Sequence, residues 1–262
     1  MKKLFFLLVI AIALAAIPAK AQIPVQQQRC YAQACLLSTW QTLVEGDTLI
    51  AIIRPTQITN TIPCNFDPKQ CGGTVFLVSD VGLNHWQPAY TVNNASQVWF
   101  ALNVKSGIDI VGVMASSGYN QPGNTGFRGD FDFDVYLMEF PPVTGIDTPS
   151  EKGPTPNVSS QIDAGTVTAT TSKTLLIAWT DNLRFFDAEG PLKMTPTDQR
   201  FTVLSDDGTL AVASAIVDVP GEYSFTATYN GAGFWMAGFV AFRLDGGTPE
   251  PAVRRPPLRD DH

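Results

Sequence analysis

The sequence predicts an all-β protein, folded as an antiparallel β-sandwich. Outside the first 21 residues, no window of eleven or more residues has helical apolar spacing, whereas alternating and short apolar runs recur along the chain. The clearest run, residues 222–229, places Tyr223, Phe225, Ala227 and Tyr229 on one face and polar side chains on the other. We therefore expect one face of this strand in a core and the other in solvent.

The chain begins with the pattern of a cleavable secretion signal. Lys2 and Lys3 precede an apolar stretch, residues 4–17, and small residues suited to cleavage follow at 18–21. The apolar stretch of fourteen residues is shorter than the roughly 20 that a helix needs to cross a bilayer. We expect cleavage after Ala21 and a secreted product, whether extracellular, periplasmic or at the cell surface, without a membrane span.

Cleavage would make the protein more acidic. Residues 1–21 hold three lysines and no acid, so the formal net charge would change from −7 to −10. Nucleic acids and anionic membrane surfaces are poor partners for such a chain.

The cysteines predict disulfide bonds. The mature chain has four: Cys30, Cys35, Cys64 and Cys71. An even number in a secreted protein indicates two disulfides, and four cysteines allow three pairings. An Asp-Pro turn signal between Cys64 and Cys71 would bring these two together, whereas pairing Cys30 with Cys35 needs a tight turn, so a crossed arrangement stays open. Zinc is disfavoured, because the cysteine spacings differ from those of zinc motifs and only His85 lies nearby.

Eleven further segments have strand character and are separated by clusters of Gly, Pro, Asn and Asp. They are residues 36–42, 48–54, 74–79, 97–104, 108–115, 131–140, 165–170, 174–180, 200–204, 210–217 and 234–244. About a dozen short strands indicate a sandwich or a barrel. Residues 175–179 and 234–242 are apolar on both faces, so we expect them in the middle of packed sheets.

Two segments are predicted to be a connection and a tail. Residues 141–160, rich in Pro, Gly, Ser and Thr, predict a long connection, either a domain linker or the crossover between two halves of one sandwich. The crossover is favoured, because neither flanking half shows a complete strand set. Residues 245–262 contain four prolines and few apolar residues, and predict a disordered tail.

Several short motifs follow one another along the chain in a recognisable order. They are residues 44–50, 78–86, 98–104, 136–140 before Gly145, and 221–228 leading to 240–243. This order resembles an uncharacterised family of secreted bacterial jelly-roll-like β-sandwich domains of acidobacterial type. The resemblance spans about residues 25–244, which implies a single domain over residues 22–244. It implies no catalytic residues, because the family has no established activity. The chain departs from the family in the insertion at 56–73 and at Leu83, which interrupts a Gly-Asn turn after Asp80.

Hydrolytic chemistry has little support in the sequence. A hydrolase needs a nucleophile with a base, or two facing carboxylates. The two histidines are His262, in the tail, and His85, in a turn before Trp86, and no Gly-x-Ser-x-Gly motif is present. We interpret His85 as a surface turn residue and predict no catalytic residue.

A row of aspartates is the candidate metal site. Asp130, Asp132 and Asp134 would share one face of a strand, with neighbours about 7 Å apart. Their mutual repulsion could be relieved by calcium, which binds several carboxylate oxygens. The favoured alternative is a solvated acidic edge that discourages pairing with other chains, because a flat row rarely surrounds an ion. We therefore expect no cofactor, with calcium as the alternative.

Aromatic residues near turns are the candidate ligand-binding residues. Trp86 and Tyr90 flank a Gln-Pro pair, and Tyr119 and Phe127 bracket a loop rich in Gly and Asn. Exposed rings at a sandwich edge can stack on a sugar, whereas the alternative is that Trp86 packs under its own turn.

These observations predict a non-catalytic secreted or cell-surface module that binds a glycan or a protein partner through loops at one end of the sandwich. A polysaccharide-active lyase or hydrolase on the same scaffold is the alternative, because β-sandwiches host both functions.

Overall fold

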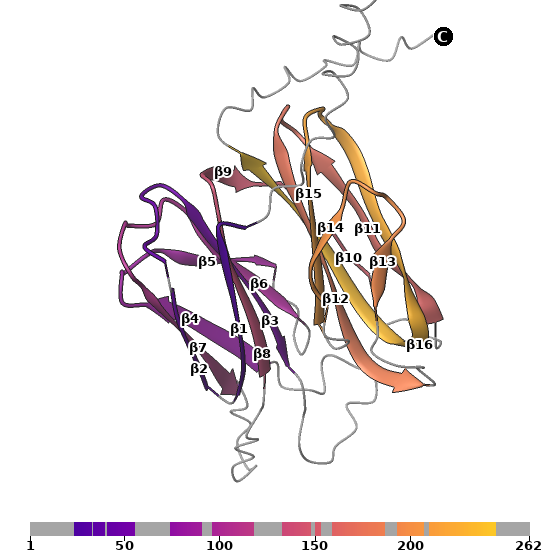
Figure 1. Ribbon diagram of the computed structural model, residues 1–262, viewed down its shortest axis with the longest axis horizontal. Coiled ribbons are helices and arrows are strands. Elements are labelled where there is room, and N and C mark those ends of the chain that lie inside the picture. Colours follow the sequence, from indigo (N-terminus) through magenta and orange to yellow (C-terminus); the bar gives the residue numbers. More distant parts are fainter. Residues whose placement is uncertain are drawn as a thin grey trace, which may run out of the picture.

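A computed structural model describes residues 24–32, 34–39, 41–55, 74–90, 96–117, 133–147, 150–152, 159–186, 193–206 and 210–244. These residues form sixteen strands in three sheets (Figure 1), and every ladder between the strands is antiparallel. The prediction of an all-β antiparallel sandwich is confirmed. Within the described residues, no helix has the length and apolar character needed to cross a bilayer.

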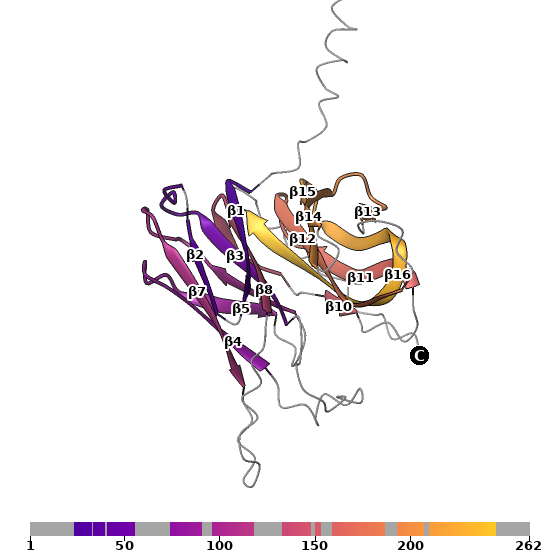
Figure 2. The ribbon, with the colours of Figure 1, turned by 60° about the horizontal axis from the view of Figure 1, so that its bottom comes forward.

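Two sheets form the N-terminal half. The central sheet has the order β1 (Gln26–Ala32), β8 (Phe133–Phe140), β3 (Thr48–Pro55), β6 (Gln97–Ala101) and β5 (Trp86–Tyr90). The outer sheet has the order β2 (Ala34–Ser38), β7 (Ile110–Ser117) and β4 (Thr74–Asp80). The two sheets lie face to face (Figure 2) and enclose a core that includes Leu37, Val111 and Val113 from the outer sheet and Leu49, Ala51 and Ile53 from the central sheet.

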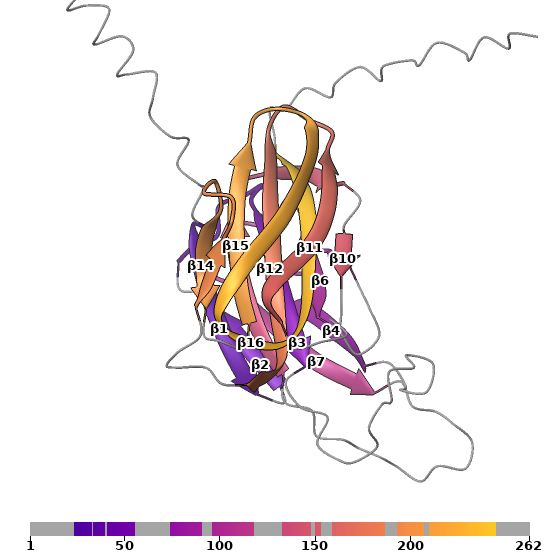
Figure 3. The same cartoon turned by 90° about the vertical axis from the view of Figure 1, so that its right-hand side faces the viewer.

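The C-terminal half is one strongly curved sheet. Its main path is β10 (Ser150–Lys152), β16 (Gly221–Leu244), β12 (Thr174–Phe186), β15 (Leu210–Val217) and β14 (Thr202–Asp206). Three more strands pair with β16: β9 (Val143–Ile146), β11 (Ser159–Ala169) and β13 (Met194–Pro196). Figure 3 shows β16 curving along the length of this sheet, which encloses its own core around Phe225, Trp235 and Phe239.

The central sheet is covered on both faces. All eight residues of β8 are buried, because alternate side chains enter different cores. Phe133, Val135 and Leu137 pack toward the outer sheet. Tyr136, Met138 and Phe140 belong to a third core, shared with the C-terminal sheet. From left to right in Figure 1, the layers are therefore the outer, central and C-terminal sheets.

The third core joins the two halves. The central sheet contributes Ile50, Ile52, Val98 and Phe100, and the C-terminal sheet contributes Leu175, Ile177, Trp179, Val212, Val240 and Phe242. The expectation that residues 175–179 and 234–242 lie centrally is confirmed, because β12 runs between β15 and β16 and both of its faces are buried.

The strand predictions differ from the structure in three ways. Residues 222–229 and 234–244 form one continuous strand, β16, instead of two. The long connection predicted at 141–160 contains two short strands, β9 and β10, which pair with β16. Strands β1, β5 and β13 were missed, because their apolar alternation is weak. The jelly-roll and single-domain expectations stay predictions, and residues 1–21 and 245–262 lie outside the described residues.

Candidate functional site

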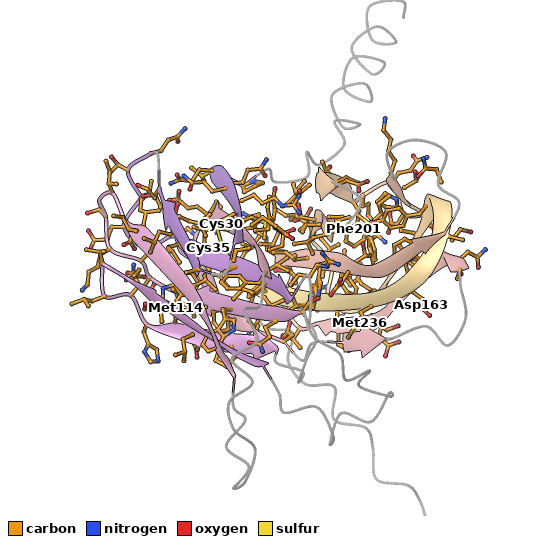
Figure 4. All side chains as sticks on the ribbon, turned by 90° about the horizontal axis from the view of Figure 1, so that it is seen from below. Cys30, Cys35, Met114, Asp163, Phe201 and Met236 are labelled. Carbon is orange, nitrogen blue, oxygen red and sulfur yellow. A yellow bond between two sulfur atoms is a disulfide. The ribbon has the colours of Figure 1, made fainter. Side chains whose placement is uncertain are left out.

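A disulfide fixes the corner where the chain passes from the central to the outer sheet. Cys30 in β1 and Cys35 in β2 are bonded, with their Cα atoms 5.8 Å apart (Figure 4). The pairing of Cys30 with Cys35 is thus confirmed, and the crossed arrangement is excluded. Cys64 and Cys71 lie outside the described residues.

The candidate aromatic residues do not form an exposed platform in the part of the chain that the structure describes. The half-buried ring of Trp86 packs against the core between the outer and central sheets. Its Nε1 donates to Asp80 Oδ2 at 2.6 Å, so the indole is held by its own turn. Tyr90 ends β5 and pairs with Val98, while Tyr119 and Phe127 lie outside the described residues.

The turn between β4 and β5 is closed by two carboxylates. The side-chain amide of Asn84 donates to Asp80 at 3.0 Å and to Asp109 at 2.9 Å. The backbone N–H of Gly82 donates to Asp109 at 2.9 Å. His85 is exposed in this turn, as expected. Across the described ranges, no group of three or more His, Cys, Asp and Glu side chains is arranged to hold a metal ion.

Asp134 is the buried member of an ion pair with Arg29. Arg29 of β1 donates through Nε to Asp134 Oδ1 at 2.7 Å, and its terminal nitrogen donates to Oδ2. The Asp134 side chain is 1 % exposed, in a strand that has neighbours on both sides. Asp134 therefore does not lie at a solvated edge. Asp130 and Asp132 lie outside the described residues, so calcium binding by the three aspartates stays a prediction.

A second ion pair, with both members buried, joins the two halves. Arg54 at the end of β3 donates to Asp181 in β12, and Ser96 donates to the other carboxylate oxygen of Asp181 at 3.1 Å. Burial raises the pKa of Asp181, while the Arg54 charge opposes this rise. Sequence reasoning missed this pair. Its one signal is that each charged residue closely follows an apolar strand segment, at 49–53 and at 175–179.

Two buried carboxyl groups meet beside β8. Glu139 accepts hydrogen bonds from Gln26 Nε2 at 2.5 Å and from the backbone N–H of Val44 at 3.2 Å. Burial, followed by the charge and hydrogen bond of Glu139, raises the pKa of Asp47 to about 6. The cavity lined by Glu139 has a volume of about 10 Å³, barely enough for one water molecule. This cavity beside Glu139 therefore has no room for a substrate.

A polar groove of about 610 Å³ opens on the C-terminal sheet. It is lined by Thr197, Asp198, Arg200, Pro220, Gly221, Glu222, Tyr223, Ser224 and Thr226. The Arg200 guanidinium lies 5.2 Å from the centre of the Tyr223 ring, which also packs against the core. Arg200 therefore covers the ring face that a sugar would need.

Asp198 in this groove is not suited to act as the proton donor of a glycosidase. Arg200 Nε donates to both carboxylate oxygens of Asp198, at 3.0 and 2.8 Å. These hydrogen bonds lower the pKa of Asp198. A glycosidase needs one carboxyl whose pKa is raised, so that it can donate a proton to the leaving group. Asp198 is shifted in the opposite direction.

The outer sheet carries a largely apolar surface on the side away from the central sheet. We define this apolar face as Ala34, Leu36, Ser38, Leu77, Ser79, Val81, Ile108, Ile110, Gly112 and Met114. Met114 pairs with Ala34 on one side and with Leu77 on the other, so the side chains form a continuous surface across three strands. Leu36 is 78 % exposed and Met114 58 % exposed. None of the ten residues carries a charge.

The apolar face lies far from the C-terminal sheet. Figure 4 shows Met114 in the opposite half of the molecule from Asp163, Phe201 and Met236. Sequence reasoning missed this surface, because β2, β4 and β7 carry apolar residues on both sides, a pattern that predicts burial on both sides.

No protein family matches the chain, and no curated protein or solved structure matches it either. The resemblance to secreted bacterial sandwich domains therefore stays a prediction.

Proposed function

We propose that the protein is an exported, non-catalytic module that binds a protein partner through the apolar face. The observation that carries this proposal is the continuous, uncharged surface formed by Leu36, Leu77, Ile110 and Met114 on three paired strands. Single exposed apolar residues are ordinary, but a contiguous apolar surface marks an interaction site.

A protein partner fits this surface better than a glycan does. Sugar-binding sites combine an exposed aromatic ring with polar groups that bond the hydroxyls, and the apolar face has no aromatic side chain. In the described part of the chain, the Trp86 indole is hydrogen-bonded to Asp80 within its own turn, and the Tyr223 ring is covered by Arg200. Aliphatic side chains instead gain free energy when another apolar surface removes them from water.

The apolar face is also preorganised. It lies on the paired strands β2, β7 and β4, and the disulfide holds Cys35, next to Leu36, at the sheet corner. A rigid surface loses little conformational entropy on binding, so more of the interaction free energy contributes to affinity.

Site-specific photo-crosslinking in the cells that produce the protein tests this function. A photoreactive residue in place of Leu36 is expected to give discrete protein adducts, which Met114→Glu abolishes. The matched control is Thr166, exposed on β11 of the C-terminal sheet, where no such adducts are expected. Absence of adducts at position 36 would reject the proposal. Glycan-array binding that Met114→Glu leaves unchanged would instead support a glycan-binding site elsewhere.

A further inference from the structure

We infer that the partner is a second copy of this chain, bound with its apolar face against the same face about a twofold axis. This inference rests on the proposed function and goes further by naming the partner.

The chain already stacks its sheets through apolar faces. The core between the outer and central sheets and the core between the central and C-terminal sheets both form in this way. The apolar face has the same aliphatic composition but lies in solvent. A second outer sheet would cover it by the same sheet-on-sheet packing.

Charge favours a self-complementary contact on this side of the molecule. The chain has a formal net charge of −7, so two copies repel each other over most of their surfaces. In a twofold interface each residue near the axis faces its own counterpart, and charged residues there would oppose like charges. The polar members of the apolar face are the neutral residues Ser38 and Ser79.

The shape of the face also suits a twofold contact. Gly112 lies in the middle strand and has no side chain, and a Cβ atom added there would lie 3.6 Å from Leu36 Cδ2. Leu36 therefore projects next to a position that carries no side chain. In the dimer, the Leu36 side chains of the two copies would pack against each other over the Gly112 positions.

The size of the face sets the strength of the dimer. Strands of five, eight and seven residues, about 4.8 Å apart and with about 3.3 Å per residue, cover about 300 Å² per copy. Stable interfaces bury about 800 Å² per partner. We therefore expect a weak, reversible dimer, with a dissociation constant on the order of 10–100 μM.

Analytical ultracentrifugation of residues 22–262 tests the inference. The wild-type chain is expected to be monomeric at about 1 μM and mostly dimeric at about 500 μM. Because the contact is apolar, 1 M NaCl should not dissociate the dimer. A chain that stays monomeric at the highest concentration would overturn the inference.

Matched variants identify the surface involved. Met114→Glu should weaken association at least tenfold, because it places two carboxylates in the contact, whereas Thr166→Glu adds the same charge on the C-terminal sheet and should have no effect. Because Met114 is exposed, the thermal midpoint of the dilute variant should match that of the wild type. A dimer that withstands Met114→Glu would refute the proposed contact.

The crosslinking and ultracentrifugation results distinguish the two proposals. If position 36 crosslinks to residues 110–117 of a second copy, both proposals hold. If it crosslinks to a different protein and the chain stays monomeric, the binding function survives and self-association is rejected. If neither adducts nor dimers form, both are rejected.

Discussion

The guanidinium of Arg54 in the N-terminal half binds the carboxylate of Asp181 in the C-terminal half. Their side chains are 6 % and 1 % exposed. The surrounding core consists of aliphatic and aromatic side chains such as Ile52 and Trp179. Contact between the two halves therefore depends on charge neutralisation as well as on apolar packing.

Removal of one member of this ion pair should destabilise the protein strongly. Arg54→Met leaves the Asp181 carboxylate buried without its guanidinium, so we expect a loss of about 3–5 kcal/mol in the free energy of unfolding, measured with urea. The double variant Arg54→Met/Asp181→Leu should recover most of this loss. As a control, Arg200→Met removes the exposed pair with Asp198 and should cost less than about 1 kcal/mol. Equal losses for Arg54→Met and Arg200→Met would contradict the prediction.

The buried acid Asp47 should make stability depend on pH. Its pKa in the folded protein is about 6, above the ordinary value of 3.8, so the folded state binds the proton more tightly than the unfolded state. The resulting stabilisation is complete below about pH 3.8, is lost as the pH rises through 6, and amounts to about 3 kcal/mol at most.

Asp47→Asn tests this linkage, because an amide keeps a donor toward Glu139 without a charge. Urea unfolding between pH 4 and 8 should show a smaller decline in stability for the variant than for the wild type. The variant should also be the more stable protein at pH 8. If the free energy of unfolding fell equally with pH in the wild type and the variant, Asp47 would not be the group that makes stability depend on pH.

Strands with clear alternation were predictable from sequence, but the pairing of the sheets was not. Residues 210–217 match β15, because this apolar segment is long and ends at turn residues. Leu36 and Leu37 lie side by side in one apolar run, yet Leu36 is 78 % and Leu37 3 % exposed. Hydropathy does not indicate which face of a strand another sheet will cover.

The charged residues show the same limit. The aspartates around position 134 form an acidic row in the sequence, and the cation that neutralises Asp134 is Arg29, 105 residues away. Such partners become visible only when the register between β1 and β8 is known. By contrast, the disulfide between Cys30 and Cys35 was one of the three pairings that the sequence left open, and the structure forms the tight turn that it needs.

Substitution by alanine should change the stability of the protein differently at two strand glycines. A Cβ atom at Gly238 would overlap the ring of Trp179, which is buried in the core between the two halves. Gly238→Ala should therefore lower the free energy of unfolding by about 1–3 kcal/mol. Gly112→Ala meets its nearest atom at 3.6 Å and should be neutral or slightly stabilising in the dilute monomer. Thermal melts of both variants at about 1 μM test this; a stable Gly238→Ala protein would show that Trp179 can move.

The turn residue Leu83 offers a stabilising substitution. Its φ angle is 56°, in the left-handed region that aliphatic side chains disfavour, and its side chain is 80 % exposed. Leu83→Asn should therefore raise the free energy of unfolding by about 0.5–1 kcal/mol. Asn103 has a φ of 52°, so Asn103→Leu is the reciprocal control and should destabilise by a similar amount. Chemical denaturation that ranks the two variants in the reverse order would refute the strain argument.

The pairing of β1 with β8 sets the earliest point in synthesis at which the central sheet can close. Residues 26–32 bond residues 133–139, so the first strand of the central sheet has no partner in that sheet until about 100 more residues have been made. At ordinary translation rates this delay is about 5–20 s. The nascent chain must keep β1 unpaired throughout that interval, and its native sheet can close only after synthesis has passed residue 140.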